Sequence, residues 1–140
     1  MANSCGRFRT NYFRVTDAGK LKKIIAKCQS TDGEEVELFD SDFDGEKLYG
    51  FGCSAQLQGY YNEEAEEYDF NAFANDLQTV VAPGDAIIIM EIGYEKLRYV
   101  CASAFIITSE TKECLDFIPL ALQKAAEMLR NPDYQTRVEY

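Results

Sequence analysis

The chain has 140 residues, of which 46% are hydrophobic and 27% charged, the composition of one globular domain rather than of a disordered segment. Its longest aliphatic run, 86–90, is too short to cross a bilayer. Residues 1–10 lack the apolar core of a secretory leader. We therefore expect one cytoplasmic domain over residues 1–140 that binds no membrane. The net charge of −10 disfavours nucleic acid as a partner, and a chain with no histidine and five cysteines that form no CxxC pair is not expected to hold zinc or a disulfide framework.

The first thirty residues predict a strand followed by a basic amphipathic helix. Residues 9–15 are rich in aromatic and β-branched side chains, as strands are, and Asp17 then offers a helix N-cap. Four apolar residues follow with helical spacing: Leu21, Ile24, Ile25 and Cys28. Residues 1–30 hold seven Lys/Arg and one acid, and the fold could place these bases close to the acidic segment at 40–46.

Two strands, at 36–39 and 48–53, are expected next, joined by a hairpin. Asp44-Gly45 is a strong hairpin signal because both central residues of a type I′ turn need a positive φ. An acidic loop at 59–69 then leads into a second helix, which Asp69 or Asn71 caps and which Pro83 ends. The apolar stripe of this helix is Phe70, Phe73, Leu77, Val80 and Val81.

Two longer strands and a third helix complete the chain. We expect a buried central strand at 86–92 and an edge strand at 97–108; a turn at Tyr94-Glu95 would set Glu91 opposite Arg98 as a cross-strand ion pair. A short strand at 114–117 and a helix at 118–130 precede a polar tail, 131–140. The inner face of that helix is expected to carry Ile118, Ala121, Leu122, Ala125 and Leu129.

The order of these elements predicts an α+β fold with a mainly antiparallel sheet. The first six elements follow the β-α-β-β-α-β order of the split βαβ, or ferredoxin-like, arrangement, which the C-terminal hairpin strand and the third helix extend. Two helices on one face of the sheet would bury their apolar stripes. A strand such as 97–108 at a sheet edge could pair with a strand of a second copy. A homodimer is therefore one possible assembly.

Three aspartates in the first hairpin raise the question of a metal. Asp40, Asp42 and Asp44 match the first half of a calcium loop, D-x-D-x-D-G, whose alternate oxygen ligands suit Ca²⁺. The twelfth position of such a loop should be a bidentate glutamate, and here it is Phe51. A calcium-dependent module is therefore one alternative, while we favour no metal and expect no cofactor.

A second alternative is RNA or single-strand binding through aromatic residues of the sheet. The RNA-recognition motif is matched in part by Lys47, Tyr49, Gly50 and Phe51. Tyr12 and Phe13 on the first strand could supply a second stacking position. The segment 31–95, with seventeen acids and one lysine, would repel a phosphate backbone.

We do not expect an enzyme. The chain lacks a histidine that could serve as the base for a serine or cysteine nucleophile. It also lacks the phosphate-binding loop, the nucleophile elbow and the zinc-protease motif. Glu91 stands between Met90 and Ile92, where burial could raise its pKa, but the cross-strand pair with Arg98 is the simpler interpretation.

The acidic segment 31–95 supports our main hypothesis. A run of carboxylates is commonly a solvated face, but the tyrosines within 59–69 are typical of interface cores. We therefore predict an acidic protein-binding module whose partner has a basic surface, with inhibition of a nucleic-acid-handling protein by charge mimicry as its mode of action. The residues expected to bind the partner are Tyr60, Tyr61, Glu63, Glu64, Glu66, Glu67, Tyr68 and Asp69.

Three short segments resemble a group of known sequences. Residues 11–17 (NYFRVTD), 95–100 (EKLRYV) and 136–140 (TRVEY) are similar to segments of small acidic proteins carried on bacterial plasmids, integrative elements and phages. The resemblance implies a setting of mobile elements and host defence, in which anti-restriction and anti-CRISPR inhibitors are found. It implies no role for any single residue.

Overall fold

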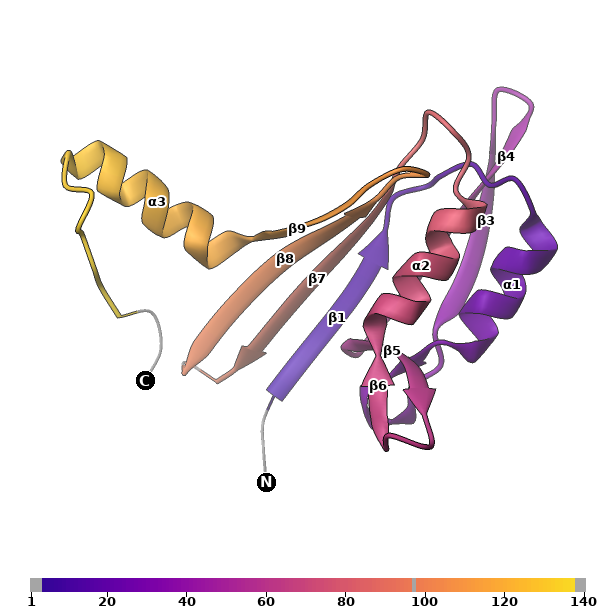
Figure 1. The fold of residues 1–140 in the computed structure, drawn as a ribbon, viewed down its shortest axis with the longest axis horizontal. Helices are drawn as coiled ribbons and strands as arrows, with labels where there is room; N and C mark the ends of the chain where they lie inside the picture. The colour runs from indigo at the N-terminus through magenta and orange to yellow at the C-terminus, as the bar shows by residue number, and fades with distance from the viewer. Residues whose placement is uncertain (1–3, 97, 138–140) are drawn as a thin grey trace.

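The computed structural model of this chain describes residues 4–96 and 98–137. They form an α+β fold with a mainly antiparallel sheet, as the sequence predicts (Figure 1). The elements in chain order are β1 (Ser4–Thr10), α1 (Ala18–Lys27), β2 (Gln29–Ser30), a 3-10 turn (Thr31–Gly33), β3 (Glu37–Phe43), β4 (Glu46–Cys53), β5 (Leu57–Asn62), β6 (Glu67–Asp69), α2 (Phe70–Val80), β7 (Ile87–Glu95), β8 (Tyr99–Ile107), β9 (Lys112–Asp116) and α3 (Phe117–Leu129). None of the helices in the described ranges combines the length and the apolar character that crossing a membrane requires.

The main sheet has the strand order β3-β4-β1-β7-β8-β9, and each strand runs antiparallel to its neighbours. A small second sheet has the order β2-β5-β6. Strand β8 lies between β7 and β9, so the expectation that 97–108 forms an edge strand is wrong; Leu97 itself lies outside the described residues. The short C-terminal strand β9 takes the edge because it folds back on β8 through the turn at 108–111.

The hydrophobic core lies between one face of the main sheet and helices α1 and α2. Phe51 of β4 is fully buried and meets Phe13 edge to face, with ring centroids 6.2 Å apart. Its ring also meets that of Phe73 of α2 edge to face, with centroids 6.0 Å apart. Leu21 of α1 and Leu77 of α2 are also fully buried. Both helices therefore bury the apolar stripes that the sequence predicts. Each stripe recurs with the helical period, which places its residues on one face of the helix.

Local signals set the ends of these elements. The carboxylate of Asp17 accepts a hydrogen bond from the Lys20 N–H at 3.0 Å and starts α1. Asp69 does the same for α2, accepting from the Ala72 N–H at 2.9 Å. Asp44 and Gly45 have φ values of 50° and 79°, and they join Phe43 to its cross-strand neighbour Glu46. The predicted tight turn is confirmed.

The predicted ion pair between Glu91 and Arg98 is wrong. Strand β7 runs on to Glu95, which lies opposite Tyr99, so Glu91 lies opposite Ser103 instead. The Glu91 carboxylate accepts a hydrogen bond from the Leu57 N–H at 2.8 Å. Arg98 forms an ion pair with Glu95 at 3.6 Å across the turn.

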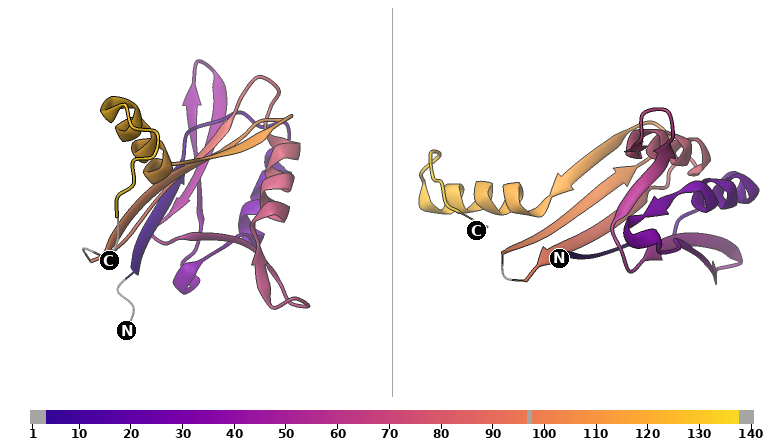
Figure 2. Two further views of the ribbon diagram at one scale, coloured as in Figure 1. Left: turned by 60° about the vertical axis from the view of Figure 1, so that its left-hand side comes forward. Right: turned by 90° about the horizontal axis from the view of Figure 1, so that it is seen from below.

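Helix α3 forms where it is expected, but its predicted inner face is not buried. No residue of α3 is buried, and Leu129 is 59% exposed. The helix continues directly from β9 and ends far from α1 and α2 (Figure 1, Figure 2). Because β9 ends at Asp116 and α3 begins at Phe117, no connecting loop is present that could turn the helix back onto the sheet.

Candidate functional site

The site predicted from the acidic loop is a β-hairpin, which we call the acidic hairpin, residues 57–69. Strands β5 and β6 pair antiparallel, with Tyr61 opposite Tyr68. The Asn62 side-chain oxygen accepts hydrogen bonds from the Glu64 and Ala65 N–H groups at 3.0 and 3.1 Å. The tight turn is thereby closed by its own residues. The hairpin projects beyond the end of α2 (Figure 1).

The acidic hairpin carries an exposed cluster of charge. Its four glutamates are all exposed, and none forms an ion pair within the described ranges 4–96 and 98–137. They are Glu63, Glu64, Glu66 and Glu67. The rings of Tyr61 and Tyr68 lie edge to face with centroids 5.1 Å apart. These two side chains are 42% and 40% exposed, so the charge stands beside accessible aromatic surface.

Tyr60 is placed differently from the expectation. It is only 6% exposed, so it does not belong to the accessible surface. Its ring packs against Phe73 with centroids 5.6 Å apart, and its hydroxyl donates to Asp76 at 2.7 Å. Burial raises the pKa of the Tyr60 hydroxyl, and the hydrogen bond to Asp76 raises it further by a smaller amount. Adjacent strand residues face opposite sides, a signal that could have separated Tyr60 from Tyr61.

Asp69 has a structural role within the hairpin. It is exposed, as expected, but its carboxylate caps α2 through the Ala72 N–H. It also lies opposite Tyr60 in the β5–β6 ladder. The accessible part of the predicted site is therefore made of the four glutamates with Tyr61 and Tyr68, while Tyr60 and Asp69 hold the hairpin to the helices.

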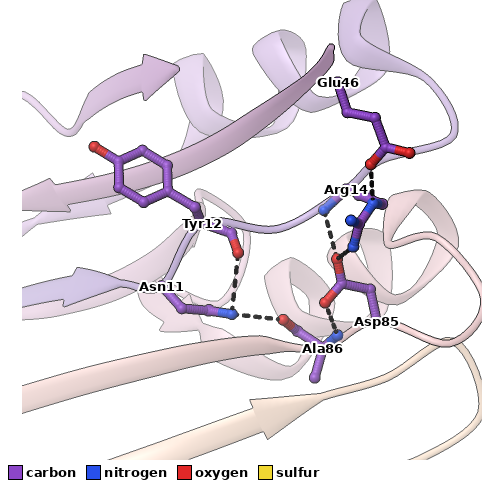
Figure 3. Close-up of polar contacts among 6 residues, drawn as sticks. All are labelled: Asn11, Tyr12, Arg14, Glu46, Asp85 and Ala86. Atoms are coloured by element: carbon purple, nitrogen blue, oxygen red, sulfur yellow. Dashed lines mark hydrogen bonds and ion pairs between the residues drawn. The ribbon is translucent and has the colours of Figure 1, made fainter. Parts of the chain in front are cut away.

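A second acidic region, the β3–β4 hairpin, meets part of the basic N-terminal segment. The Arg14 guanidinium contacts Glu46 and lies 3.6 Å from Asp85 (Figure 3). Asp85 also accepts a hydrogen bond from the Arg14 backbone N–H at 2.8 Å. The neighbouring Asn11 donates to the Ala86 carbonyl at 3.0 Å. The expected proximity of the basic N-terminal segment to the acidic segment at 40–46 is therefore confirmed for Arg14.

The three aspartates considered for calcium lie along an extended hairpin. Asp40 is opposite Tyr49 and Asp42 opposite Lys47 in the β3–β4 ladder, while Asp44 forms the turn. A search of the described part of the chain finds no group of three or more His, Cys, Asp or Glu side chains that could hold a metal ion.

The aromatic residues considered for base stacking do not share an accessible face. Phe51 is fully buried beneath the helices, and Tyr49 packs against the same core. Tyr12 is 43% exposed, and its ring meets Phe39 edge to face at 5.7 Å. Because Phe51 is fully buried against Phe73 of α2, its side chain cannot stack on a base in the folded protein.

The face of the sheet opposite the helices is a surface that the sequence analysis does not identify. It forms a groove of about 470 Å³. Met90 and Ile92 line this groove and are 43% and 48% exposed. Arg9 also lines it, with its guanidinium 5.2 Å from the centroid of the Phe39 ring. The unbroken apolar run at the start of β7 carries the signal for this surface, because a continuous run places apolar side chains on both faces of a strand.

Comparison with protein-family models, with curated proteins and with solved structures finds no match in any of the three.

Proposed function

We propose that the protein is an acidic protein-binding module, which binds a basic surface of another protein through the acidic hairpin. The observation that carries this proposal is a cluster of four exposed glutamates beside the exposed Tyr61–Tyr68 pair. In the described part of the chain these glutamates have no ion-pair partner. Charge of one sign on an exposed surface speeds association with an oppositely charged partner. Exposed tyrosines supply the aromatic contacts that interface cores favour.

The anchoring of the hairpin supports a binding role. Tyr60 joins the hairpin to α2 through Phe73 and Asp76, and Lys27 of α1 lies 4.3 Å from the centroid of its ring. A hairpin held in this way loses little conformational entropy when it binds, because its backbone is already ordered. The glutamates can therefore act together as one preformed surface.

The partner class that we propose is a nucleic-acid-handling protein, which the module would inhibit by charge mimicry. Basic grooves are the electrostatic footprint of such proteins. An acidic hairpin seated in one would compete with the phosphate backbone. Three short segments of the chain resemble proteins of mobile elements. This resemblance supports a partner that takes part in host defence.

We also propose that β1, α1, β3, β4, α2 and β7 form a ferredoxin-like arrangement. The strand order β3-β4-β1-β7 and its antiparallel pairs support this assignment. In this description the acidic hairpin is part of an insertion between β4 and α2, and β8, β9 and α3 extend the sheet.

Affinity capture from a bacterial lysate tests the proposed function. The bait is the wild-type chain, and the test variant reverses Glu63, Glu64, Glu66 and Glu67 to lysine. A matched control makes the same change of charge in the β3–β4 hairpin, at Glu37, Asp40, Asp42 and Asp44. We expect the wild type and the control to retain a basic protein that nucleic acid displaces and that the test variant loses. Equal retention by all three chains would contradict the proposal.

A further inference from the structure

Strand β9 leaves a free edge on the main sheet. All five of its residues are exposed, and within residues 4–96 and 98–137 no strand pairs with its outer side. A free strand edge presents unpaired N–H and C=O groups that can pair with another chain. The edge is therefore a surface on which a further strand can be added.

The turn before β9 shows which residues point to this edge. The Thr108 N–H donates to the Thr111 carbonyl at 2.8 Å, so these two residues form a hydrogen-bonded pair. Such pairs alternate with non-hydrogen-bonded pairs along an antiparallel ladder. Lys112, which lies opposite Ile107, therefore turns its backbone N–H and C=O outward, and Cys114 and Asp116 do the same.

We propose that the chain forms a two-fold homodimer through antiparallel pairing of β9 with β9 of a second copy, centred on Cys114. In this register Lys112 lies opposite Asp116 of the second copy, and the pair occurs twice by symmetry. The outward backbone groups of Lys112, Cys114 and Asp116 then pair with one another. The interface is self-complementary in charge, which is the property that a two-fold contact requires.

The other edge of the sheet lacks this property. Strand β3 carries Glu37, Asp40 and Asp42 and no base, so pairing of β3 with itself would oppose like charges. Like charges directly opposite each other destabilise a strand pair. The charge pattern thus selects β9 over β3 as the edge that a second copy covers.

Helix α3 supplies apolar surface to the same interface. It follows β9 without a loop. In an antiparallel pair of β9 strands, each α3 therefore begins beside the N-terminal end of β9 in the second copy and extends beyond it. Its apolar side chains are open to contact, with Phe117 60%, Leu120 50% and Met128 75% exposed. A five-residue strand pair alone falls short of the roughly 1,200 Å² that a stable interface buries, and α3 provides the remainder.

Two variants with exchanged charges test the register. Lys112→Asp places aspartates at both positions, and Asp116→Lys places lysines at both, so each variant repels its own copy. We expect the wild type to have twice the chain mass of 15.9 kDa in light scattering at about 100 μM. Each variant should be monomeric, and their equimolar mixture should dimerise, since aspartates then face lysines. A monomeric wild type, or a mixture of folded variants that stays monomeric, would overturn the proposal.

A second measurement needs no change of charge, which matters because Lys112 also donates a hydrogen bond to Asn75. Directly opposite cysteines in a hydrogen-bonded pair have Cα atoms about 5.5 Å apart, within reach of a short bismaleimide. We expect a Cys114–Cys114 link in the wild type and in Cys101→Ser, and none in Cys114→Ser. A covalent dimer linked through Cys101 alone would overturn the register. Reversal of the four hairpin glutamates should leave this link intact, so the dimer and the proposed function fail independently.

Discussion

Tyr60 joins three elements through one side chain. Its ring packs on Phe73 of α2, its hydroxyl donates to Asp76, and Lys27 of α1 lies over the ring. Truncating a buried aromatic side chain lowers the free energy of unfolding by about 3–5 kcal/mol. Substituting an exposed residue usually changes it by no more than about 0.5 kcal/mol. Tyr60→Ala should therefore lower the free energy of unfolding in urea far more than Tyr61→Ala does. Equal effects of the two variants would show that Tyr60 does not anchor the hairpin.

Glu91 gives a prediction about pH. Burial raises the pKa of its carboxyl, while the hydrogen bond from the Leu57 N–H opposes that shift. Because the folded pKa lies above the unfolded one, the charged form costs stability at neutral pH, and this cost disappears as the pH falls below both values. Glu91→Gln, which keeps an acceptor for Leu57, should melt at a higher temperature than the wild type at pH 7. Its advantage should shrink toward pH ~4; an advantage that grows on acidification would contradict this assignment.

At the scale of the elements, the β3–β4 turn depends on backbone conformation alone. Gly45 has a φ of 79°, and a Cβ added there would meet nothing within 4 Å. Gly45→Ala should therefore destabilise the fold by about 1 kcal/mol through backbone strain. The matched control is Gly19→Ala in α1, which should be neutral or stabilise by up to about 1 kcal/mol, since alanine favours helix. Chemical denaturation measures both, and a stabilising Gly45→Ala would refute the argument.

The elements also show which signals a sequence carries. Asp17, Asp69 and Asp44-Gly45 act through neighbouring backbone groups, so caps and turns could be predicted from local order. The period of α3 predicted a helix, but a period does not say what covers its apolar face. Likewise Glu91 and Arg98 could not be paired correctly, because the length of β7, and with it the register, depends on its pairing with both β1 and β8.

At the scale of the whole molecule, we expect repulsion among the acids to exceed the attraction that the bases supply. Residues 31–95 hold seventeen acids and one lysine, and Arg14 is the one base of the described N-terminal residues that forms an ion pair with them. Added salt largely screens the interaction between exposed charges that lie more than a Debye length apart, about 10 Å at 0.1 M. The melting temperature should therefore rise as NaCl increases from low to moderate concentration. A fall would mean that attraction between the two regions outweighs repulsion.

The proposed function requires that the four hairpin glutamates bind a basic protein surface. Calorimetric titration of the protein captured by the wild-type chain tests it most directly. Four exposed ion pairs at roughly 0.2–1 kcal/mol each correspond to a loss of affinity from about fourfold to several-hundredfold on reversal of Glu63, Glu64, Glu66 and Glu67. The same reversal at Glu37, Asp40, Asp42 and Asp44 should leave Kd nearly unchanged. Equal affinity for the hairpin variant and the wild type at low salt would contradict the claim.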